Sequence, residues 1–589
     1  MGKTYAYQDK LPSLPVPELS GTKTKLLEWI EPIVGKEQFE ETRRIAEEFF
    51  AEGGDGQKLQ EKLREWDGKI NGSWLKPFWD DMYLKYRGYL PAGMNFCMLL
   101  SNEGYKEKYE KHELAGKAIR LIGELNHLIA DEEYDADTIK GKPLCMSQYR
   151  NFFRSIRIPR IGKDEHKVSK PEKKNNHVVL LYKKNMYKIS ISDEDGNIFS
   201  SGEIARCIRE IFNMETAEGE NVGIFTTAQR DEAAQIYDEL IMSKSNSDNL
   251  EVIEKALAVI CIDEESKNSQ EALENLLLSG DNKYFDKTIQ IVVTNSGEIG
   301  VNGEHTGIDG STFMTIVNYV SDGLKSEKAE EKSAGSGVKF EKLEWEIGEE
   351  LKMKLTNLNA ENRNVRKQYH LELCIFEDFG QDEIKKLKIS PDAFFHIALQ
   401  VAQYNIFGKM RSTYEPVAVR FFKEGRTECA RASSTEKLDF IKTYFSGTES
   451  NEVLYGLMQK ASDAHAVRIK ECQNGNGVER HMYGLLKMHE MFGEELCIGK
   501  TPAIFETEGY KALRYDFIST SGIGNKNVKH SAFGPVVEDG FGIFYSLMND
   551  SISINISSKS ENKENAKSLM LEFVQALRDI REIALSSIQ

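Results

Sequence analysis

The chain has 589 residues, which is more than one hydrophobic core supports, so about two to four domains are expected. Hydrophobic residues make up 40% of the chain and charged residues 29%, as is typical of globular proteins in water. The formal net charge of -17 argues against a general nucleic-acid binder, because binding to phosphates needs clustered Lys and Arg side chains.

Cysteine spacing and hydropathy exclude further classes. The 8 cysteines are scattered and form no C-x-x-C pair, which suits reduced thiols better than a disulfide framework or a zinc site. No run approaches the ~20 apolar residues of a membrane-spanning helix, so no membrane association is expected. The first residues also lack the apolar core of a signal peptide. We therefore expect a cytoplasmic protein with no nucleic-acid partner.

The apolar pattern predicts strands and helices that alternate along the chain. Strands are predicted over residues 177–182, 186–191, 256–262, 288–293 and 551–557. Helices are predicted over residues 22–66, 105–131, 201–214, 227–243, 347–362 and 561–585. Such alternation is typical of an α/β protein. The polar segment 325–337 has the composition of a linker, and we place the domains at 1–345 and 346–589.

A histidine and a carboxylate follow one of the predicted strands. After the strand at 288–293 and a Gly-containing turn at 295–300, the chain carries His305 and Asp309, with Gly307 between them. A carboxylate beside a histidine orients the ring and stabilises the imidazolium, so the pair is typical of a general base. A buried structural histidine is the alternative.

Four further motifs follow in the second half of the chain. They are Ser412–Pro416 with Phe421–Glu428, then Glu479–His481, Ile518–Ser521 and Phe533–Ile543. Together with the His305 motif, and in this order, they resemble the choline/carnitine O-acyltransferase family along nearly the whole chain. The resemblance implies an α/β (α+β) fold of two chloramphenicol-acetyltransferase-like domains, with an active-site tunnel between them.

The resemblance also implies a reaction, in which an acyl group passes directly between the sulfur of coenzyme A and the hydroxyl of a quaternary ammonium alcohol. His305 would take the hydroxyl proton, Asp309 would orient its ring, and Ser521 would donate to the tetrahedral oxyanion. No metal and no bound cofactor are expected, since coenzyme A or acyl-coenzyme A is a co-substrate. No acyl-enzyme is expected either, because the Ser hydroxyls have no base of their own in this scheme.

Three positions bear on the choice of alcohol. Carnitine has a carboxylate that choline lacks, so its site needs hydrogen-bond donors and positive charge. Carnitine members of the family use a Tyr, a Thr and an Arg, which match Tyr414, Thr427 and Arg480 here. Choline members have Val and Asn in place of the last two, so the resemblance implies carnitine. The other carnitine contacts that it implies are Ser519, Phe533 and Val536, the last two near the trimethylammonium.

The resemblance extends to the coenzyme A side. The positions that match the family's coenzyme A contacts are Lys385, Asp392 and Glu415. Gln381 stands where the family usually has a Lys, which weakens the expected hold on the 3′-phosphate, and Lys386 or Lys388 would have to compensate.

The acyl pocket is expected around Ser531, at the end of a loop predicted over 522–531. Acetyl-specific carnitine members have a Met at this position and long-chain members have a Gly. A small side chain leaves room for a short or medium acyl chain, so we expect short-chain groups such as acetyl, with medium-chain groups as the alternative.

Two other functions stay open. One is acyl transfer to choline or another trimethylammonium alcohol. The other is non-catalytic binding of acyl-coenzyme A on the same fold, although an intact His305, Asp309 and Ser521 argue against it because a binding protein needs no base. A monomer is expected in each case.

Overall fold

The computed structural model describes residues 2–215, 217–294, 297–326 and 337–588. The chain forms two compact units, and both are discontinuous in sequence. Unit 1 comprises Met1–Asp9, Asp80–Leu371 and Asn525–Gly534, and unit 2 comprises Lys10–Trp79, Glu372–Gly524 and Pro535–Gln589. The domain ranges proposed from the sequence, 1–345 and 346–589, cut the chain only once. The linker proposed at 325–337 lies mostly outside the described residues.

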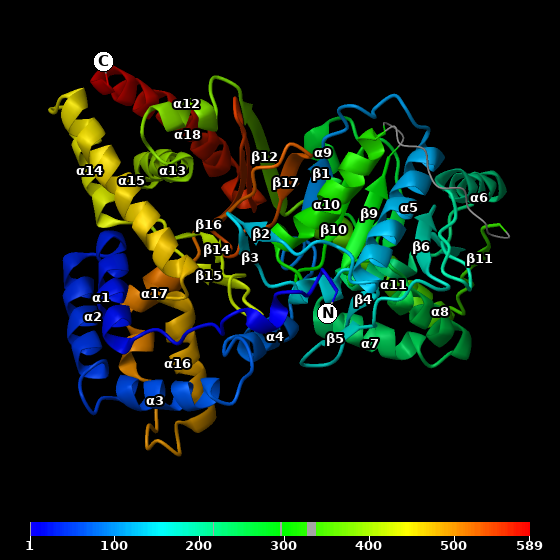
Figure 1. The fold of residues 1–589 in the computed structure, drawn as a ribbon, viewed down its shortest axis with the longest axis horizontal. Coiled ribbons are helices and arrows are strands. Elements are labelled where there is room, and N and C mark those ends of the chain that lie inside the picture. The colour runs from blue at the N-terminus through cyan, green and yellow to red at the C-terminus, as the bar shows by residue number, and fades with distance from the viewer. Residues whose placement is uncertain (1, 216, 295–296, 327–336, 589) are drawn as a thin grey trace. The chain divides into compact units, whose positions relative to one another are not determined.

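A mixed sheet of eight strands forms the centre of unit 1 (Figure 1). In spatial order its strands are β11 (Phe340–Lys342), β7 (Asn185–Ser190), β6 (His177–Tyr182), β8 (Val259–Ile262), β9 (Ile289–Val293), β10 (Ile299–Gly303), β1 (Phe96–Leu100) and β17 (Val528–Ala532). β8 runs parallel to β6 and β9, and the other neighbours pair antiparallel. Two short hairpins pair β2 (Thr138–Ile139) with β3 (Lys142–Pro143) and β4 (Ser155–Ile158) with β5 (Glu165–Val168).

Helices cover both faces of this sheet. They are α5 (Lys111–Ala130), α6 (Ser201–Met214), α7 (Arg230–Leu240), α8 (Lys244–Lys255), α9 (Ser269–Leu278), α10 (Gly310–Lys325) and α11 (Glu349–Arg366). A Cβ atom on Gly300 would lie 2.4 Å from Leu276 of α9, and one on Gly303 would lie 3.0 Å from Phe313 of α10. Strand residues an odd number of positions apart face opposite sides, so α9 and α10 pack on opposite faces of β10.

Unit 2 contains a mixed sheet of five strands. In spatial order they are β12 (Tyr369–Phe376), β19 (Ile552–Lys559), β18 (Phe541–Leu547), β16 (Ile518–Gly522) and β13 (Thr413–Tyr414), and β14 (Pro416–Ala418) pairs separately with β15 (Thr427–Cys429). The helices are α1 (Leu19–Ile30), α2 (Lys36–Phe49), α3 (Asp55–Asp67), α12 (Gln381–Lys386), α13 (Pro391–Phe407), α14 (Thr435–Ser446), α15 (Asn451–Gln473), α16 (Glu479–Phe492), α17 (Glu508–Arg514) and α18 (Lys563–Ile588). α4 (Lys76–Leu84) crosses a boundary between the sequence segments of the two units.

The apolar core of unit 2 lies between its sheet and two long helices. Phe395 of α13 stacks on Tyr545 of β18 with 3.8 Å between ring centroids. Phe395 also meets Phe573 of α18 edge-on at 4.8 Å. These aromatic contacts, with the buried aliphatic residues around them, fix α13 against the sheet that carries β16.

The α/β class predicted from the sequence is confirmed. The predicted strands at 177–182, 288–293 and 551–557 correspond to β6, β9 and β19. Among the strands that were not predicted are β10 and β17. β10 follows the predicted turn at 295–300, of which residues 295–296 lie outside the described residues. β17 occupies the end of the predicted loop at 522–531, and the assignment of a loop to Ser531 is wrong because Ser531 pairs with Met98 of β1.

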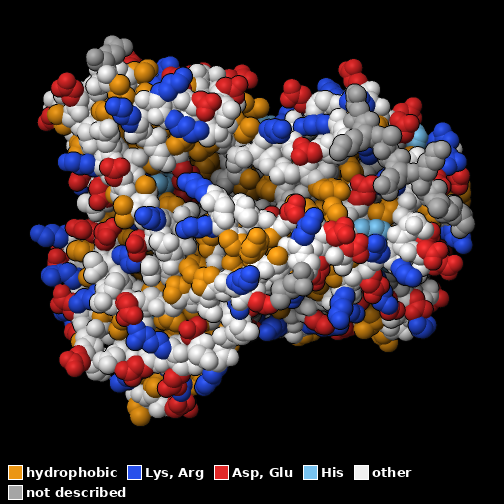
Figure 2. Space-filling model, viewed as in Figure 1, with side chains coloured by type: hydrophobic (Ala, Val, Ile, Leu, Met, Phe, Trp, Pro, Cys, Tyr) orange, Lys and Arg blue, Asp and Glu red, His pale blue; other side chains and the backbone are white. Residues whose placement is uncertain are grey.

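Three further observations concern membrane-spanning helices, surface charge and the cysteines. Within the described part of the chain, no helix is long and apolar enough to cross a membrane. On the face drawn in Figure 2, Lys and Arg side chains are interspersed with Asp and Glu side chains. All eight cysteines are free thiols, of which Cys497 is exposed and Cys374 half-buried.

Candidate active site

His305 lies in the short connection between β10 and α10 of unit 1. The strand ends at Gly303 and the helix begins at Gly310, with Asp309 as its N-cap. The ring of His305 contacts Phe96 edge-on at 5.1 Å and Tyr83 at 5.5 Å between centroids. Its side chain keeps 30% of its exposure, so one side of the ring is held by aromatic neighbours while the residue stays accessible to a ligand.

Asp309 lies near His305 and is held by a second residue. Its Oδ1 is 4.0 Å from Nδ1 of His305, an ion-pair distance that is too long for a hydrogen bond. Gln148, in a short 3-10 helix over Ser147–Asn151, donates from Nε2 to Oδ2 of Asp309 at 2.7 Å. The backbone N–H of Asp309 donates in turn to Oε1 of Gln148 at 2.8 Å. This two-way contact fixes the carboxylate, and no pattern in the sequence indicated it.

A buried ion-pair network holds the residue that precedes His305. Glu304 accepts hydrogen bonds from the backbone N–H of Thr306 at 3.2 Å and from its Oγ1 at 2.5 Å. Arg157, fully buried, donates to Glu304 at 3.5 Å and to Asp164 at 2.6 Å. Its Nη2 also donates to the carbonyl of Tyr83 at 2.8 Å. The guanidinium of Arg157 therefore connects Glu304, which precedes His305 in the chain, to the segment that contains Tyr83.

Ser531 lies in the same sheet as the strand that leads to His305. It is paired with Met98 of β1, which is paired in turn with Val301 of β10. Paired residues and residues two apart share a face, so Ser531 is on the face of Phe96, whose ring contacts His305. The buried Oγ of Ser531 has no hydrogen-bond partner among the described residues. Phe533, half-buried, follows this strand.

In unit 2, three residues proposed to bind carnitine come together around one guanidinium. Arg480, in the first turn of α16, donates from Nη2 to the hydroxyl of Tyr414 at 2.9 Å. Its Nε donates to the backbone carbonyl of Thr427 at 3.1 Å. Arg480 is only 7% exposed, so little water competes with a ligand for its charge. A buried guanidinium with an adjacent phenol can bind a carboxylate.

Two further residues complete this arrangement, and the sequence did not indicate their roles. The guanidinium of Arg480 lies 4.1 Å from the ring centroid of Trp79, in cation–π geometry. Glu428 accepts the backbone N–H of Arg480 at 3.2 Å and that of Cys429 at 2.9 Å. Burial raises the pKa of the Glu428 carboxyl to about 7, against the opposing effect of Arg480. Glu428 is therefore neutral over much of the range in which Arg480 is charged.

The serines of the Ile518–Ser521 motif lie on β16 beside Tyr414. Ser519 is paired with Tyr414 of β13, and Ser521 is two residues further along. These three side chains therefore project from one face of the unit 2 sheet. Thr520, on the opposite face, donates from Oγ1 to the carbonyl of Tyr414 at 2.8 Å. Val536, which follows in the chain, is 56% exposed.

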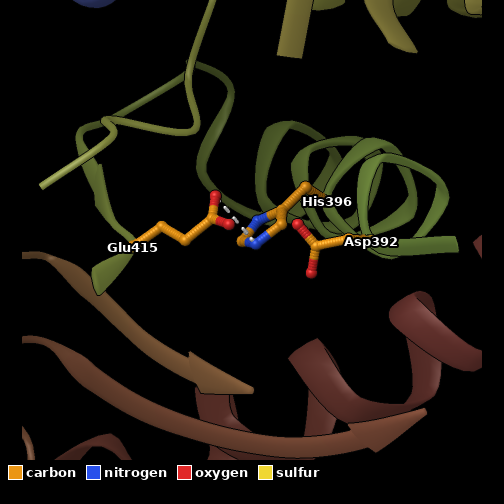
Figure 3. Close-up of side chains that lie close together, drawn as sticks. All are labelled: Asp392, His396 and Glu415. Atoms are coloured by element: carbon orange, nitrogen blue, oxygen red, sulfur yellow. Dashed lines mark ion pairs between the residues drawn. The ribbon is translucent and has the colours of Figure 1, made fainter. Parts of the chain in front are cut away.

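The residues proposed to bind coenzyme A separate into two groups. Lys385, exposed on α12, pairs with Asp382 at 3.4 Å. Asp392 and Glu415, by contrast, belong to a cluster with His396 (Figure 3). Burial raises the pKa of Glu415 well above its usual value, and the neighbouring Asp392 raises it further.

Comparisons with known proteins relate the whole chain to one family. The family model described as choline/carnitine O-acyltransferase matches residues 14–579. Carnitine O-acetyltransferase of Homo sapiens is 30% identical and aligns over 98% of this chain and 94% of its own. Choline O-acetyltransferase of Sus scrofa is 28% identical, over 96% and 91%. The condensation domain of the Monacolin K polyketide synthase MokA covers 86% of this chain and 96% of its own at a TM-score of 0.38 and 9% identity, too little to support an argument.

The buried network around Arg157 predicts that replacing this residue strongly destabilises the protein. Arg157→Met leaves the carboxylates of Asp164 and Glu304 without this partner, and breaking a buried pair in this way costs about 3–5 kcal/mol of unfolding free energy. The control is Lys163→Met, which removes an exposed pair with Asp81 and costs less than about 1 kcal/mol. Urea unfolding followed by tryptophan fluorescence measures both, and equal small losses would contradict the network's role.

Proposed function

The chain belongs to the choline/carnitine O-acyltransferase family, and on that premise we propose that it is a carnitine O-acyltransferase that uses short-chain acyl groups. The acyl group moves reversibly between the sulfur of coenzyme A and the hydroxyl of carnitine. The observation that carries the choice of carnitine is the contact of the buried Arg480 with Tyr414 and Thr427. Acetyl is the proposed acyl group, with medium-chain groups as the alternative, because Ser531 is small and lies on the same sheet face as Phe96.

In the proposed reaction His305 takes the proton of the carnitine hydroxyl. The oxygen attacks the thioester carbonyl, the tetrahedral oxyanion accepts a hydrogen bond from Ser521, and the carbon–sulfur bond breaks. His305 then returns the proton to the thiolate of coenzyme A. Asp309, fixed by Gln148, favours the protonated ring electrostatically across the 4.0 Å between them. No metal, bound cofactor or acyl-enzyme takes part.

Recognition of carnitine is proposed to depend on its two charged ends. Arg480 and Tyr414 supply a cation and a donor for the carboxylate, and Trp79 stacks on the guanidinium and limits its freedom. Ser519 lines the site, while Phe533 and Val536 are proposed to lie near the trimethylammonium. Lys385, Asp392 and Glu415 are proposed as contacts of coenzyme A.

The proposal also includes a monomer in the cytoplasm. All eight cysteines are free, which fits a reducing compartment. The proposed reaction needs no partner other than carnitine and acyl-coenzyme A.

Thiol release from acetyl-coenzyme A and longer acyl donors, with carnitine or choline as acceptor, tests the reaction. Removing the base in His305→Ala is expected to lower kcat by about 10²–10⁴-fold. His112→Ala on α5, whose side chain pairs with Glu110, serves as the control and keeps the activity. Release that does not depend on carnitine or choline, or that is unchanged in His305→Ala, would contradict acyl transfer and favour a coenzyme A-binding protein.

The choice of alcohol is tested by the double substitution Arg480→Asn with Thr427→Val. Loss of the guanidinium removes the partner of the carnitine carboxylate, so kcat/KM for carnitine is expected to fall by about 10²-fold or more, while choline, which has no carboxylate, loses little. Ratios of kcat/KM for the two alcohols measure the effect. A wild-type preference for choline, or an unchanged ratio in the variant, would support the alternative acceptor.

The raised pKa of Glu428 predicts that carnitine binding depends on pH. Below about pH 7 the Glu428 carboxyl is neutral, and Arg480 keeps its full attraction for the carboxylate of carnitine. Above about pH 7 the ionised Glu428 competes with that carboxylate for Arg480. The KM for carnitine is expected to rise about three- to tenfold from about pH 6 to about pH 8. Glu428→Gln abolishes this rise. Because the folded-state pKa is raised, Glu428 also makes the protein lose stability as pH rises from 4.5 to about 7.

A KM that rises equally in the wild type and in Glu428→Gln would assign the dependence to another group. Measuring kcat in the same series separates titration of His305 from an effect on binding alone.

A further inference from the structure

A cluster of metal-ligand side chains lies inside unit 2, apart from the groups proposed to move protons. Asp392 and His396 are one turn apart on α13, so both project from one face of the helix (Figure 3). Glu415 reaches the same point from the connection between β13 and β14, and His465 reaches it from α15. Donor atoms of Asp392, His396 and Glu415 all lie within 4.8 Å of one another.

Three distances within the cluster are close to the edge length of a coordination tetrahedron. Nε2 of His396 is 3.2 Å from Oε2 of Glu415. Nε2 of His465 is 3.0 Å from Oδ2 of Asp392 and 3.7 Å from Oε2 of Glu415. Zinc–ligand bonds of about 2.0–2.1 Å in tetrahedral geometry place neighbouring donors about 3.3 Å apart. These three distances are close to that value, and His465 approaches the group formed by Asp392, His396 and Glu415.

The hydrogen bonding of the cluster is incomplete as it stands. Glu415 is only 6% exposed, and its buried Oε2 makes no hydrogen bond among the described residues. An unsatisfied carboxylate oxygen inside a protein is costly, and it is costlier beside a second carboxylate such as Asp392. A divalent cation between the two carboxylates removes both penalties.

Residues around the cluster orient its donor atoms. The hydroxyl of Tyr545 donates to Oδ1 of Asp392 at 2.6 Å, which leaves Oδ2 turned toward His465. On the other side of His465, Nζ of Lys437 lies 3.0 Å from Nδ1 and holds the orientation of the ring. The contact of Tyr545 with Asp392 is of the kind that fixes carboxylate orientation in metal sites. The side chain of Asp392 is 37% exposed, which offers a route for an ion from solvent.

We propose that Asp392, His396, Glu415 and His465 form a binding site for one divalent ion of the zinc type. Two imidazoles favour zinc and related transition ions over Mg²⁺ and Ca²⁺, which prefer oxygen donors only. The ion has no part in the proposed acyl transfer. It shares Asp392 and Glu415 with the proposed coenzyme A contacts, so zinc and coenzyme A compete for these two residues.

The test measures metal content and affinity in the full chain, without turnover. Purified protein is loaded with zinc, passed through a desalting column and analysed by elemental mass spectrometry, and its affinity is measured by competition with a chromophoric chelator. We expect about one zinc ion per chain in the wild type. His396→Gln and Glu415→Gln each remove a ligand and should weaken binding by more than about 100-fold, since even neighbours of ligands cost 10–100-fold.

The matched control is His481→Gln, a buried histidine of the same unit that is bonded to Thr22 and Gln60 instead of to carboxylates. It should keep the wild-type affinity. Cobalt loading provides a second readout, because a tetrahedral nitrogen–oxygen site gives visible absorption that His396→Gln should abolish.

Zinc that is retained equally in all variants would be adventitious and would overturn the proposal, as would a wild type that fails to compete with the chelator. If His396→Gln does not fold, the near-isosteric Glu415→Gln and the wild-type competition still decide the question. Because no step uses turnover, a negative result leaves the proposed acyl transfer intact, and an inactive enzyme leaves the metal site intact.

Discussion

Charge buried away from water is the constraint on which both units depend. Each buried charge must find partners of fixed geometry, and those partners then fix the backbone that carries them. In unit 1 the guanidinium of Arg157 is fully buried and joins Asp164, Glu304 and the carbonyl of Tyr83. His305 follows Glu304 directly in the chain, so this network also restrains the backbone of His305. The proposed base, held in this way, needs little reorganisation during the proposed reaction.

In unit 2 a buried charge is again held by partners of fixed geometry, here at the residue proposed to bind carnitine. Arg480 is buried between the ring of Trp79, the phenol of Tyr414 and the carbonyl of Thr427, so its orientation is set before any ligand arrives. Below about pH 7 the nearby Glu428 does not cancel its charge, because burial raises the pKa of Glu428 to about 7. An interaction between a ligand carboxylate and this guanidinium is therefore stronger than it would be on an open surface.

Two neighbouring strands of unit 1 show how glycine limits prediction from the sequence. β9 is an unbroken run of buried residues and was predicted, whereas β10 was not, because Gly300 and Gly303 weaken the strand pattern. Those glycines are required by the close approach of Leu276 and Phe313. β17 was missed because its partner β1 lies far away in the chain, and local pattern carries no information about such pairing.

The same distinction applies to the candidate site. Motifs identified Tyr414, Thr427 and Arg480 as a set, and the structure brings them together around one guanidinium. Nothing in the sequence connects Trp79 to Arg480, on which its ring lies. Nothing in the sequence connects Gln148 to Asp309 either, although Gln148 makes both hydrogen bonds that hold Asp309. Contacts between residues distant in sequence decide these roles.

The cluster in unit 2 extends this reasoning to residues that the acyl-transfer chemistry does not use. A buried charged group is tolerated when its partners are complete, as around Arg157, and Glu415 lacks such completion. Burial and the neighbouring Asp392 raise the pKa of the Glu415 carboxyl well above its usual value, whereas a divalent ion would favour its ionised form. The proposed metal site and the proposed coenzyme A contacts share both carboxylates, so occupancy by one ligand would lower the affinity for the other.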